Sequence, residues 1–430
     1  MLLWCNHIHK NANNIEIINE YTNNNNSYFH SFVKIDDTRN FFFIIKFCFF
    51  VFFKEWPKIM ESLPKVGIFG GGPLTNEIVP SIKKAGFDII AVWTEISEEA
   101  DHIAQKFGIE FSSSNMDDVL LHKDVGLLII LSPPITHSQI AVKALGIGKH
   151  VYVSAPCSIN TAQVLRMVQS AAYYPNLIAR VGYCLRSSPV VSEMKQRISD
   201  GYLGKSIKHC DARINCPSLV ARDSSYSWRC SEIMGGGVLA QYGNPLFDLI
   251  SYLTNQKVST LHGVVRTVQN STQKINGIRT ITADDVVSLT FETLSNTLGT
   301  MTLSSLGGCD DGVFNQELIM TGDEGQLILR NSNLYGRKFL DNTKETLLLS
   351  TNDDDFQISS TTTTATELPE MYLSSYTRQF SELKLLFLNQ LDDHNDRLAS
   401  FEDALYTASI IEAVRQSSME KSWVKVLNEK

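Results

Sequence analysis

The sequence lacks three features, and each absence excludes a class of protein. It has no basic excess, because 38 Lys and Arg stand against 46 Asp and Glu and the net charge is −8, so we expect no nucleic-acid partner. It has no apolar run of about 18 residues, the length that a membrane span needs, since Lys46 interrupts the longest run at 41–53. It has no Cys-x-x-Cys pair and no histidine at zinc-ligand spacing, so we expect no metal site.

The eight cysteines are scattered along the chain without the spacing of a disulfide framework. A reduced, mostly buried set of this kind fits a cytoplasmic protein. Large secreted domains also fold without disulfides, so secretion stays open as the alternative.

The first 60 residues differ in composition from the rest of the chain. Residues 1–40 hold ten Asn and residues 41–53 hold eight Phe, and neither stretch has the period of a helix or a strand. About forty polar residues precede Phe41, which is not the layout of a secretory signal. We expect residues 1–60 to be a low-complexity extension outside the fold, with the mature chain beginning at or near Met60.

From Lys65 onward, short apolar runs alternate with amphipathic stretches, which is typical of βαβ units around a parallel sheet. The pattern predicts strands at 66–69, 87–93, 125–131 and 150–153, and helices at 77–85 and 97–107. The third strand is apolar throughout, as a strand covered on both faces should be. We therefore expect a Rossmann-like nucleotide-binding domain over residues 61–182.

The turn after the first strand is rich in glycine. Gly70 and Gly72 keep the first two glycines of the pattern G-x-G-x-x-G, Pro73 follows them, and Thr75 replaces the third glycine. Glycines at a strand-to-helix turn let backbone N–H groups and the positive end of the helix approach a pyrophosphate. The turn predicts binding of a nicotinamide dinucleotide, NAD or NADP.

The end of the second strand leaves the choice between NAD and NADP open. An acidic residue at this point binds the ribose 2′-hydroxyl in NAD-specific sites, and here Thr94 takes that position with Glu95 one place later. Thr94 lacks the two acceptors of a carboxylate and does not repel a 2′-phosphate. Glu95 either turns toward the ribose or stays in solvent at the start of the next helix.

Several runs match the motifs of one family. They are Ser132-Pro133-Pro134-Ile135-Thr136-His137, residues 144–151, 184–189 and 200–205, Trp228-Arg229, and Gly235-Gly236-Gly237. Together these runs resemble the glucose-fructose oxidoreductase/inositol dehydrogenase (Gfo/Idh/MocA) family over residues 64 to about 425. Residues 144–151, 173–175, 210–214 and 400–406 are most similar to the animal glucose-fructose oxidoreductase domain-containing proteins.

The resemblance implies an α/β fold in which the Rossmann domain precedes an α+β domain with a large, mostly antiparallel sheet, here over residues 183–430. The sequence agrees, because residues 286–291 and 300–303 alternate with the period of two that half-buried strands show. Residues 351–367 are too polar to pack and predict a loop, and residues 400–417 predict a closing helix. The resemblance also implies that Ser132, Pro133 and His137 lie at the cofactor.

The family's catalytic positions carry the wrong residues for proton transfer. The resemblance implies a Lys in a Glu-Lys-Pro motif and an Asp and a His in Asp-x-Gly-x-His, and these positions are Ala155, Gln241 and Pro245 here. None of these three side chains moves a proton. His137 and Asp248 are the candidates for a substitute base. The pair Asn244-Pro245 has a second explanation, since Asn and Pro favour a helix start at that point.

Four residues are candidates for a substrate pocket: Arg186, Trp228, Gln241 and Asn244. Arg186 either holds an anionic ligand or forms an ion pair within the protein. The resemblance implies a dinucleotide partner, a small sugar-like ligand and a homo-oligomer.

The sequence therefore predicts an oxidoreductase-like protein with a binding, sensing or extracellular-matrix-assembly role. The alternative is an active NAD(P)-dependent oxidoreductase that acts on a sugar or cyclitol through a rearranged proton relay.

Overall fold

The computed structural model describes residues 16–19, 31–34, 63–217, 226–271, 280–306, 314–340, 344–351, 368–391 and 396–426. The chain divides into two compact units, Met1–Ile59 and Met60–Lys430. In the first unit, strands β1 (Glu16–Asn19) and β2 (Ser31–Lys34) form an antiparallel pair. The sequence shows no strand period in either segment, so these two strands were not predicted. The expected start at Met60 and the loop after Thr351 lie outside the described residues.

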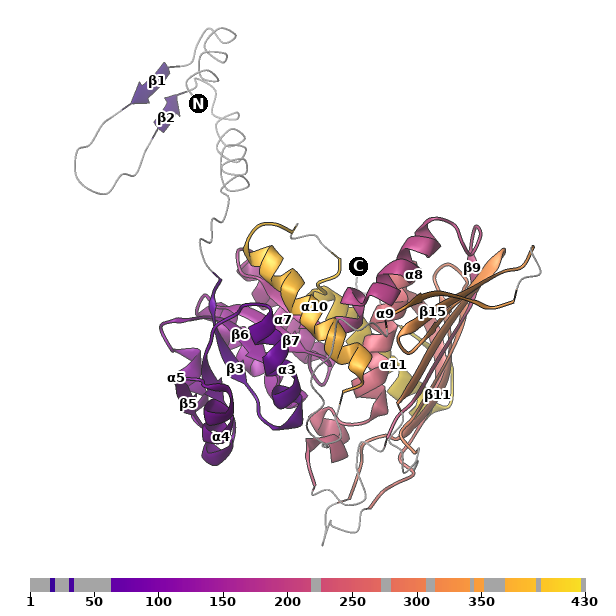
Figure 1. Cartoon of the computed structure of the whole chain (residues 1–430), viewed down its shortest axis with the longest axis horizontal. Helices are drawn as coiled ribbons and strands as arrows, with labels where there is room; N and C mark the ends of the chain where they lie inside the picture. The colour runs from indigo at the N-terminus through magenta and orange to yellow at the C-terminus, as the bar shows by residue number, and fades with distance from the viewer. Residues whose placement is uncertain are drawn as a thin grey trace. The chain divides into compact units, whose positions relative to one another are not determined.

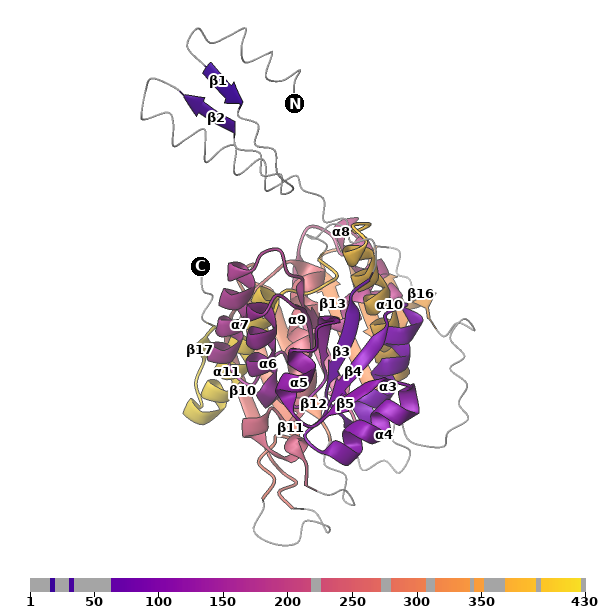
Figure 2. The same cartoon turned by 90° about the vertical axis from the view of Figure 1, so that its left-hand side faces the viewer.

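The second unit begins with a sheet whose strand pairs are all parallel, in the order β5-β4-β3-β6-β7-β8. Its central strands are apolar because helices cover both faces, and every residue of β4 is buried. Figure 2 shows this layer with its helices toward the viewer. The elements are β3 (Lys65–Phe69), α3 (Gly72–Lys84), β4 (Ile89–Trp93), α4 (Ser97–Phe107), β5 (Phe111–Ser113), α5 (Met116–Leu120), β6 (Val125–Ile130), α6 (Pro134–Gly146), β7 (His150–Ser154), α7 (Thr161–Tyr173) and β8 (Ala179–Gly182).

The predicted strands of this domain are all present, but the first helix begins earlier than the sequence indicates. We expected it over 77–85, whereas α3 starts at Gly72 and has Pro73 in its first turn. Proline is tolerated there because the first N–H groups of a helix have no partner within the helix. The glycine turn and the helix start are therefore one feature.

The remainder of the second unit is built on a sheet in the order β16-β15-β14-β13-β9-β12-β11-β10-β17, in which only β9 and β12 are paired in parallel among the described strands. This confirms the expected mostly antiparallel sheet. The elements are η1 (Cys184–Ser187), α8 (Pro189–Ser199), β9 (Ile207–Asn215), η2 (Trp228–Cys230), η3 (Glu232–Met234), η4 (Leu239–Gly243), α9 (Asn244–Thr254), β10 (Val258–Arg266), β11 (Val286–Thr293), β12 (Leu298–Ser304), β13 (Asn315–Gly322), β14 (Gly325–Arg330), β15 (Asn333–Lys338), β16 (Thr346–Ser350), α10 (Glu370–Phe387), α11 (Phe401–Glu420) and β17 (Val424–Lys425).

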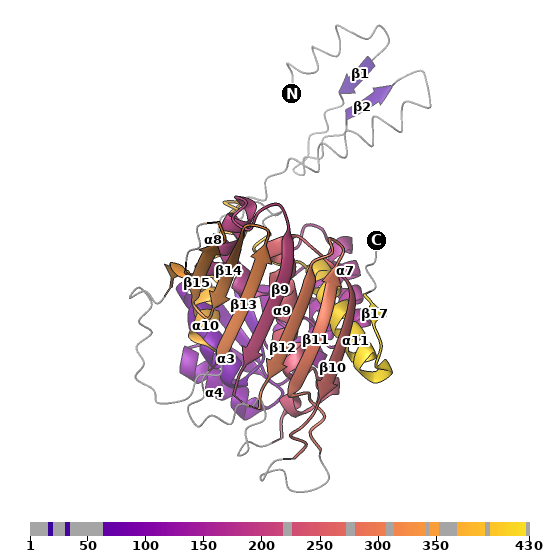
Figure 3. The same cartoon turned by 90° about the vertical axis from the view of Figure 1, so that its right-hand side faces the viewer.

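Each face of this large sheet has its own chemistry. On β11, Val287, Leu289 and Phe291 are buried, whereas Ser288 and Glu292, on the opposite face of the strand, are exposed. Phe291 packs on Phe247 of α9, with ring centroids 5.7 Å apart. Helices α9, α10 and α11 lie behind the sheet in Figure 3. The other face is the one turned toward the viewer in that figure. The period of two in the sequence therefore separates a helix-covered face from an open one.

The two last helices pack on both domains. In Figure 1, α10 and α11 lie between the parallel sheet and the large sheet. Ser400 and Asp403 form a capping box at the start of α11, and the Val181 N–H donates to the Ala399 carbonyl at 2.9 Å, which extends the edge of β8. None of the described helices combines the length and the apolar character that crossing a membrane would require.

Candidate functional site

The glycine turn lies where the carboxyl ends of β3, β4 and β6 meet. The Gly70 N–H donates to the Trp93 carbonyl at 2.8 Å, and the Leu131 N–H donates to the Phe69 carbonyl at 2.7 Å. A Cβ added to Gly70 would lie 2.5 Å from the Ser132 nitrogen, and Gly70 has a φ of 129°. Only glycine permits both that conformation and that approach of two strands.

The first turn of α3 offers unpaired backbone N–H groups to an anion. The helix has no acidic residue in its first turn and no side chain that caps its start. Gly72 has a φ of 77°, and no heavy atom lies within 4 Å of the position a Cβ would take. Space in front of a helix N-terminus, lined by glycine backbone, is the geometry that receives a pyrophosphate.

Thr75 and Pro73 surround the same turn without entering it. Thr75, at the place of the third glycine, is buried, and its hydroxyl donates to the Gly71 carbonyl at 3.2 Å. Pro73 is exposed in the first turn of α3. Thr75 therefore packs the helix against the sheet, and the two glycines carry the ligand-facing surface.

Thr94 faces inward at the end of β4. It is 1% exposed, and its hydroxyl donates to the Ile96 carbonyl at 2.6 Å. Glu95 is exposed. The expected ribose-binding position is thus occupied by a hydroxyl that already has a partner.

His137 connects two loops at the carboxyl edge of the sheet. It is fully buried, with Nε2 2.6 Å from the Ser132 carbonyl oxygen and Nδ1 3.2 Å from the carbonyl oxygens of Pro156 and Cys157. Burial lowers the pKa of His137 to about 4, although the carbonyl contacts oppose this shift. The imidazole ring is shielded from solvent and surrounded by backbone carbonyls, so its role is to hold the two loops in place. This geometry argues against the use of His137 as a substitute base.

These residues fit a dinucleotide. The carboxyl ends of adjacent parallel strands bring together the turn at Gly70–Gly72, the end of β4 at Thr94, and the turn at Ser132 and Pro133. Ser132 is buried and Pro133 precedes the first turn of α6. The glycine turn would hold the pyrophosphate, and the other two segments would flank the riboses.

The three family catalytic positions lie on two segments next to this edge. Ala155 follows β7 directly and is partly buried against the core of the first domain. Gln241 is in η4, and its Nε2 is buried without a hydrogen-bond partner among the described residues. Pro245 is buried in the first turn of α9. None of these three side chains can gain or lose a proton near neutral pH.

The α-helix α9 begins at Asn244 with Pro245 in its first turn, as the second explanation for this pair requires, but the π-helical turn η4 leads directly into it. Val238 and Gly243 already have right-handed helical backbone angles, and residues 239–243 form a π-helical turn that continues into α9. Pro245 has no N–H to donate to the carbonyl four residues earlier. A π-helical turn before the proline is a known way for a helix to continue past such a missing bond.

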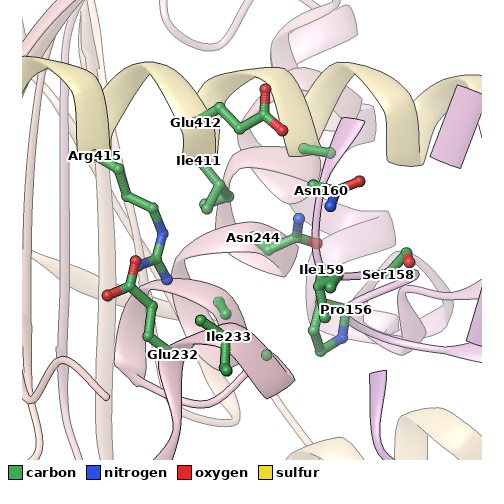
Figure 4. A pocket seen from close by; sticks show the side chains of 13 residues that line it. Pro156, Ser158, Ile159, Asn160, Glu232, Ile233, Asn244, Ile411, Glu412 and Arg415 are labelled. Carbon is green, nitrogen blue, oxygen red and sulfur yellow. The ribbon is translucent and has the colours of Figure 1, made fainter. Parts of the chain in front are cut away.

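A pocket of about 270 Å³ lies beside these segments (Figure 4). Pro156 and Asn244 line it, each next to a family catalytic position. Asn244 is 4% exposed, and its amide accepts from the Tyr183 hydroxyl at 2.6 Å. Its other lining residues are Ser158, Ile159, Asn160, Glu232, Ile233, Gly235, Ala240, Ala408, Ile411, Glu412 and Arg415.

The charged side chains of the pocket are paired with protein groups. Arg415 pairs with Glu232 and lies 3.4 Å from the Asp284 carboxylate. The Glu412 carboxylate accepts from the Thr161 N–H at 2.8 Å, at the start of α7. The pocket therefore presents polar groups for recognition, and its lining has two carboxylates, Glu232 and Glu412, against one guanidinium, Arg415.

Arg186 and Asp248 form a buried ion pair away from this pocket. The Arg186 guanidinium donates to both Asp248 oxygens, at 2.8 and 2.5 Å, and lies 3.3 Å from the Asp403 carboxylate. Both residues are at most 5% exposed. Of the two alternatives for Arg186, the structure has the ion pair. Asp248 is unsuited as a substitute base, because its two oxygens are engaged and shielded.

Trp228 and Cys157 are in contact with protein groups and do not line the pocket. Trp228, in η2, lies under the Arg229 guanidinium at 4.8 Å from the ring centroid and does not line the pocket. Cys157 is 2% exposed, and burial raises the pKa of its thiol, which keeps it protonated. Of the candidates for a substrate pocket, Asn244 lines the cavity, and Gln241 is three residues before it.

Sequence reasoning missed the acidic and basic residues that surround the pocket. Glu232 comes from η3, and Glu412 and Arg415 come from α11, about 180 residues later in the sequence. No motif links them, since only the packing of α11 on α7 and η4 brings them together. Glu99, whose carboxylate lies against Gly71, was also missed.

A glycine turn at the carboxyl edge of a parallel sheet places the protein in the class of Rossmann-fold dinucleotide-binding proteins. Residues 64–183 match the family described as "Oxidoreductase family, NAD-binding Rossmann fold", and residues 191–328 match the "GFO/IDH/MocA C-terminal domain". The chain belongs to the Gfo/Idh/MocA oxidoreductase family, and it carries that family's NAD-binding domain. The family expected from the motifs is confirmed.

The chain is similar to vertebrate members of the expected subgroup. It is 37% identical to glucose-fructose oxidoreductase domain-containing protein 2 of Homo sapiens over 380 residues, which cover 86% of this chain and 96% of that protein. It is 32% identical to glucose-fructose oxidoreductase domain-containing protein 1 of Xenopus tropicalis over 374 residues, with 85% and 93% covered. Its fold matches a solved levoglucosan dehydrogenase in complex with NADH and levoglucosan, with a TM-score of 0.72, 19% identity, and 85% and 100% of the two chains covered.

Proposed function

We propose that this protein binds a nicotinamide dinucleotide and acts through binding, without the proton transfer of the family's dehydrogenases. The observation that carries the proposal is the set of residues at the three catalytic positions, Ala155, Gln241 and Pro245. The resemblance assigns these positions a Lys, an Asp and a His. Each lost proton-handling group is of a type that contributes about 10²–10⁴-fold in general acid–base catalysis.

The chemistry of the family requires a base in a fixed place. When bound, the dinucleotide supplies a nicotinamide that accepts or donates hydride. The protein must take the hydroxyl proton of the substrate at the same time. His137 and Asp248, the nearest substitutes that the sequence offers, are buried and bonded to protein groups. These contacts support the loss of turnover.

The pocket beside Pro156 and Asn244 supports a small polar ligand. Its lining combines amide, hydroxyl and carboxylate groups with the apolar side chains of Ile159, Ile233 and Ile411. A sugar has hydroxyls for the first set and C–H faces for the second. We infer that a sugar-like molecule occupies this pocket, so that the protein can report or require its presence without converting it.

A homo-oligomer follows from the open face of the large sheet. Every second residue of β11 and β12 is on this face, for example Ser288 and Thr302, which are exposed. No helix of the described chain covers this face (Figure 3). We infer that a second copy covers this face. A sensing role in the cytoplasm and an assembly role in the extracellular matrix are both compatible with a binding protein, and the cysteine content favours the first.

Two measurements on the purified protein test the proposal. Mass spectrometry of the small molecules that copurify should find NAD(H) or NADP(H). A panel of inositols, glucose, xylose and their keto forms should give no dinucleotide-linked turnover above the background of Gly72→Asp, a variant designed not to bind. Robust oxidation of one of these compounds by the wild type, absent in Gly72→Asp, would establish the alternative, an active oxidoreductase with a rearranged relay. Failure to bind any nicotinamide dinucleotide would refute both.

A further inference from the structure

Glu99 has an unusual position beside the glycine turn. It lies in the first turn of α4, and its carboxylate fills the space where a side chain of Gly71 would be, so a Cβ there would collide with it. The residue is only half-buried. Within the described part of the chain, the carboxylate forms no ion pair and receives no hydrogen bond. A carboxylate held against the backbone of the turn, with its acceptors unused, is available to a ligand.

The surroundings of this carboxylate are acidic. Residues 94–99 contain Glu95, Glu98 and Glu99 and no basic residue. Lys106 is at the other end of α4, where it donates to the Asn76 side chain at 2.8 Å. Thr94, at the end of β4, is turned inward. The segment that follows β4 therefore offers no lysine or arginine of its own to a second phosphate.

The two nicotinamide dinucleotides differ at one point. NAD(H) has a hydroxyl at the 2′ position of the adenosine ribose, and NADP(H) has a phosphate with a charge of about −2. In a Rossmann domain this ribose lies between the end of the second strand and the glycine turn. Here these are the end of β4 and Gly70–Gly72, and the Glu99 carboxylate, on the helix that follows β4, lies against Gly71 of that turn.

We propose that Glu99 makes this site selective for NAD(H) by accepting hydrogen bonds from the ribose hydroxyls and repelling a 2′-phosphate. The inference rests on the dinucleotide binding proposed above. Glu99 is preferred to Glu95 and Glu98 because those two are exposed, whereas the backbone of Gly71 limits where the Glu99 carboxylate can move. The pyrophosphate is common to both dinucleotides, so its own repulsion by Glu99 cancels in the affinity ratio.

The test is the ratio of affinities for NAD⁺ and NADP⁺, measured by calorimetry on the full chain. We expect the wild type to prefer NAD⁺ at least about tenfold, or about 1.4 kcal/mol in binding free energy, since like charges near a protein surface repel each other. Glu99→Gln keeps the shape of the side chain and removes its charge. It should tighten NADP⁺ binding by about tenfold while changing NAD⁺ binding far less. Glu98→Gln, on the exposed side of the same turn, is the matched control and should leave the ratio unchanged.

Salt distinguishes repulsion from shape. The preference of the wild type should shrink at high ionic strength, and that of Glu99→Gln should not. Equal wild-type affinities for the two dinucleotides would overturn the proposal. A ratio that responds to Glu95→Gln and not to Glu99→Gln would also overturn it and assign the role to Glu95. If the wild type binds neither dinucleotide, the proposed function itself fails, and the selectivity proposal fails with it.

Discussion

Aspartate in place of Gly72 should abolish dinucleotide binding at a small cost in stability. Gly72 has a φ of 77°, which costs an L-residue roughly 1–2 kcal/mol. No steric cost adds to this, because no heavy atom lies within 4 Å of the new Cβ. The added carboxylate would face the pyrophosphate. One pair of like charges about 4 Å apart costs ~4 kcal/mol at an effective dielectric constant of ~20, which is on the order of a thousandfold in Kd.

The chain offers a matched control for this variant. Gly148, in the turn between α6 and β7, has a φ of 81° and likewise no heavy atom within 4 Å of a Cβ position. It lies at the amino end of β7, and the glycine turn lies at the carboxyl end of β3, so the two are at opposite edges of the parallel sheet. Gly148→Asp should therefore lose the same stability as Gly72→Asp and keep full affinity.

The assay is calorimetric titration of both variants with NAD⁺ and NADH, together with denaturant unfolding. Undiminished affinity in Gly72→Asp would refute the assignment of the turn. An equal loss of affinity in Gly148→Asp would show that the effect comes from general destabilisation.

Four further predictions follow. Because burial lowers the pKa of His137 to about 4, against 6.5 for a free histidine, the stability that this group contributes is complete above pH 6.5 and is lost as the pH falls toward 4. The free energy of unfolding should drop by about 2 kcal/mol between pH 7 and pH 5 from this residue alone, and denaturant titrations should show a smaller drop in His137→Gln; an equal drop would contradict the assignment. Asp248→Asn should lower the free energy of unfolding by about 3–5 kcal/mol, because it leaves a buried guanidinium without its main partner; a variant with unchanged stability would refute the structural role. Sedimentation at micromolar concentration should give a dimer or larger assembly, and a monomer would argue against the proposal that a second copy covers the open face of the large sheet. Ala155→Lys alone should not produce turnover, because the groups that would set the pKa of the new lysine are missing. The triple variant with Gln241→Asp and Pro245→His restores all three residue types of the family's catalytic positions. Activity of the single variant in dinucleotide-linked assays would show that the other groups needed for proton transfer are present.

The fold was predictable wherever the signal is local. The apolar runs of β4 and β6 reflect burial on two faces, and the alternation in β11 reflects burial on one, so each strand carries its own pattern. The glycine turn was equally local, since Gly70 is required by a backbone angle and by the nearby strand end. The start of α3 was misplaced because Pro73 and the glycines are typical of turns, yet they also suit the first turn of a helix.

The candidate site was predictable only in part because its contacts join distant segments. Arg186 meets Asp248 across 62 positions and Asp403 across more than 200, so its charge is satisfied by residues that no local pattern connects. The helix start that Asn244-Pro245 favours is present at α9, but the π-helical turn that leads into it was not predicted. The contact of Glu99 with Gly71 depends on the packing of α4 beside the turn.

The position of α10 and α11 has a consequence for the synthesis of the protein. The helices of the parallel-sheet domain are complete once residue 173 has been made, but two of them receive their covering much later. Ser81 of α3 bonds to Thr377 of α10 at 2.7 Å, and Thr161 of α7 bonds to Glu412 of α11. At roughly 5–20 residues per second, the ribosome needs tens of seconds to reach these partners. During that interval α3 and α7 of the nascent first domain lack the helices that pack on them. In a chain that stops before residue 368, they would stay uncovered permanently.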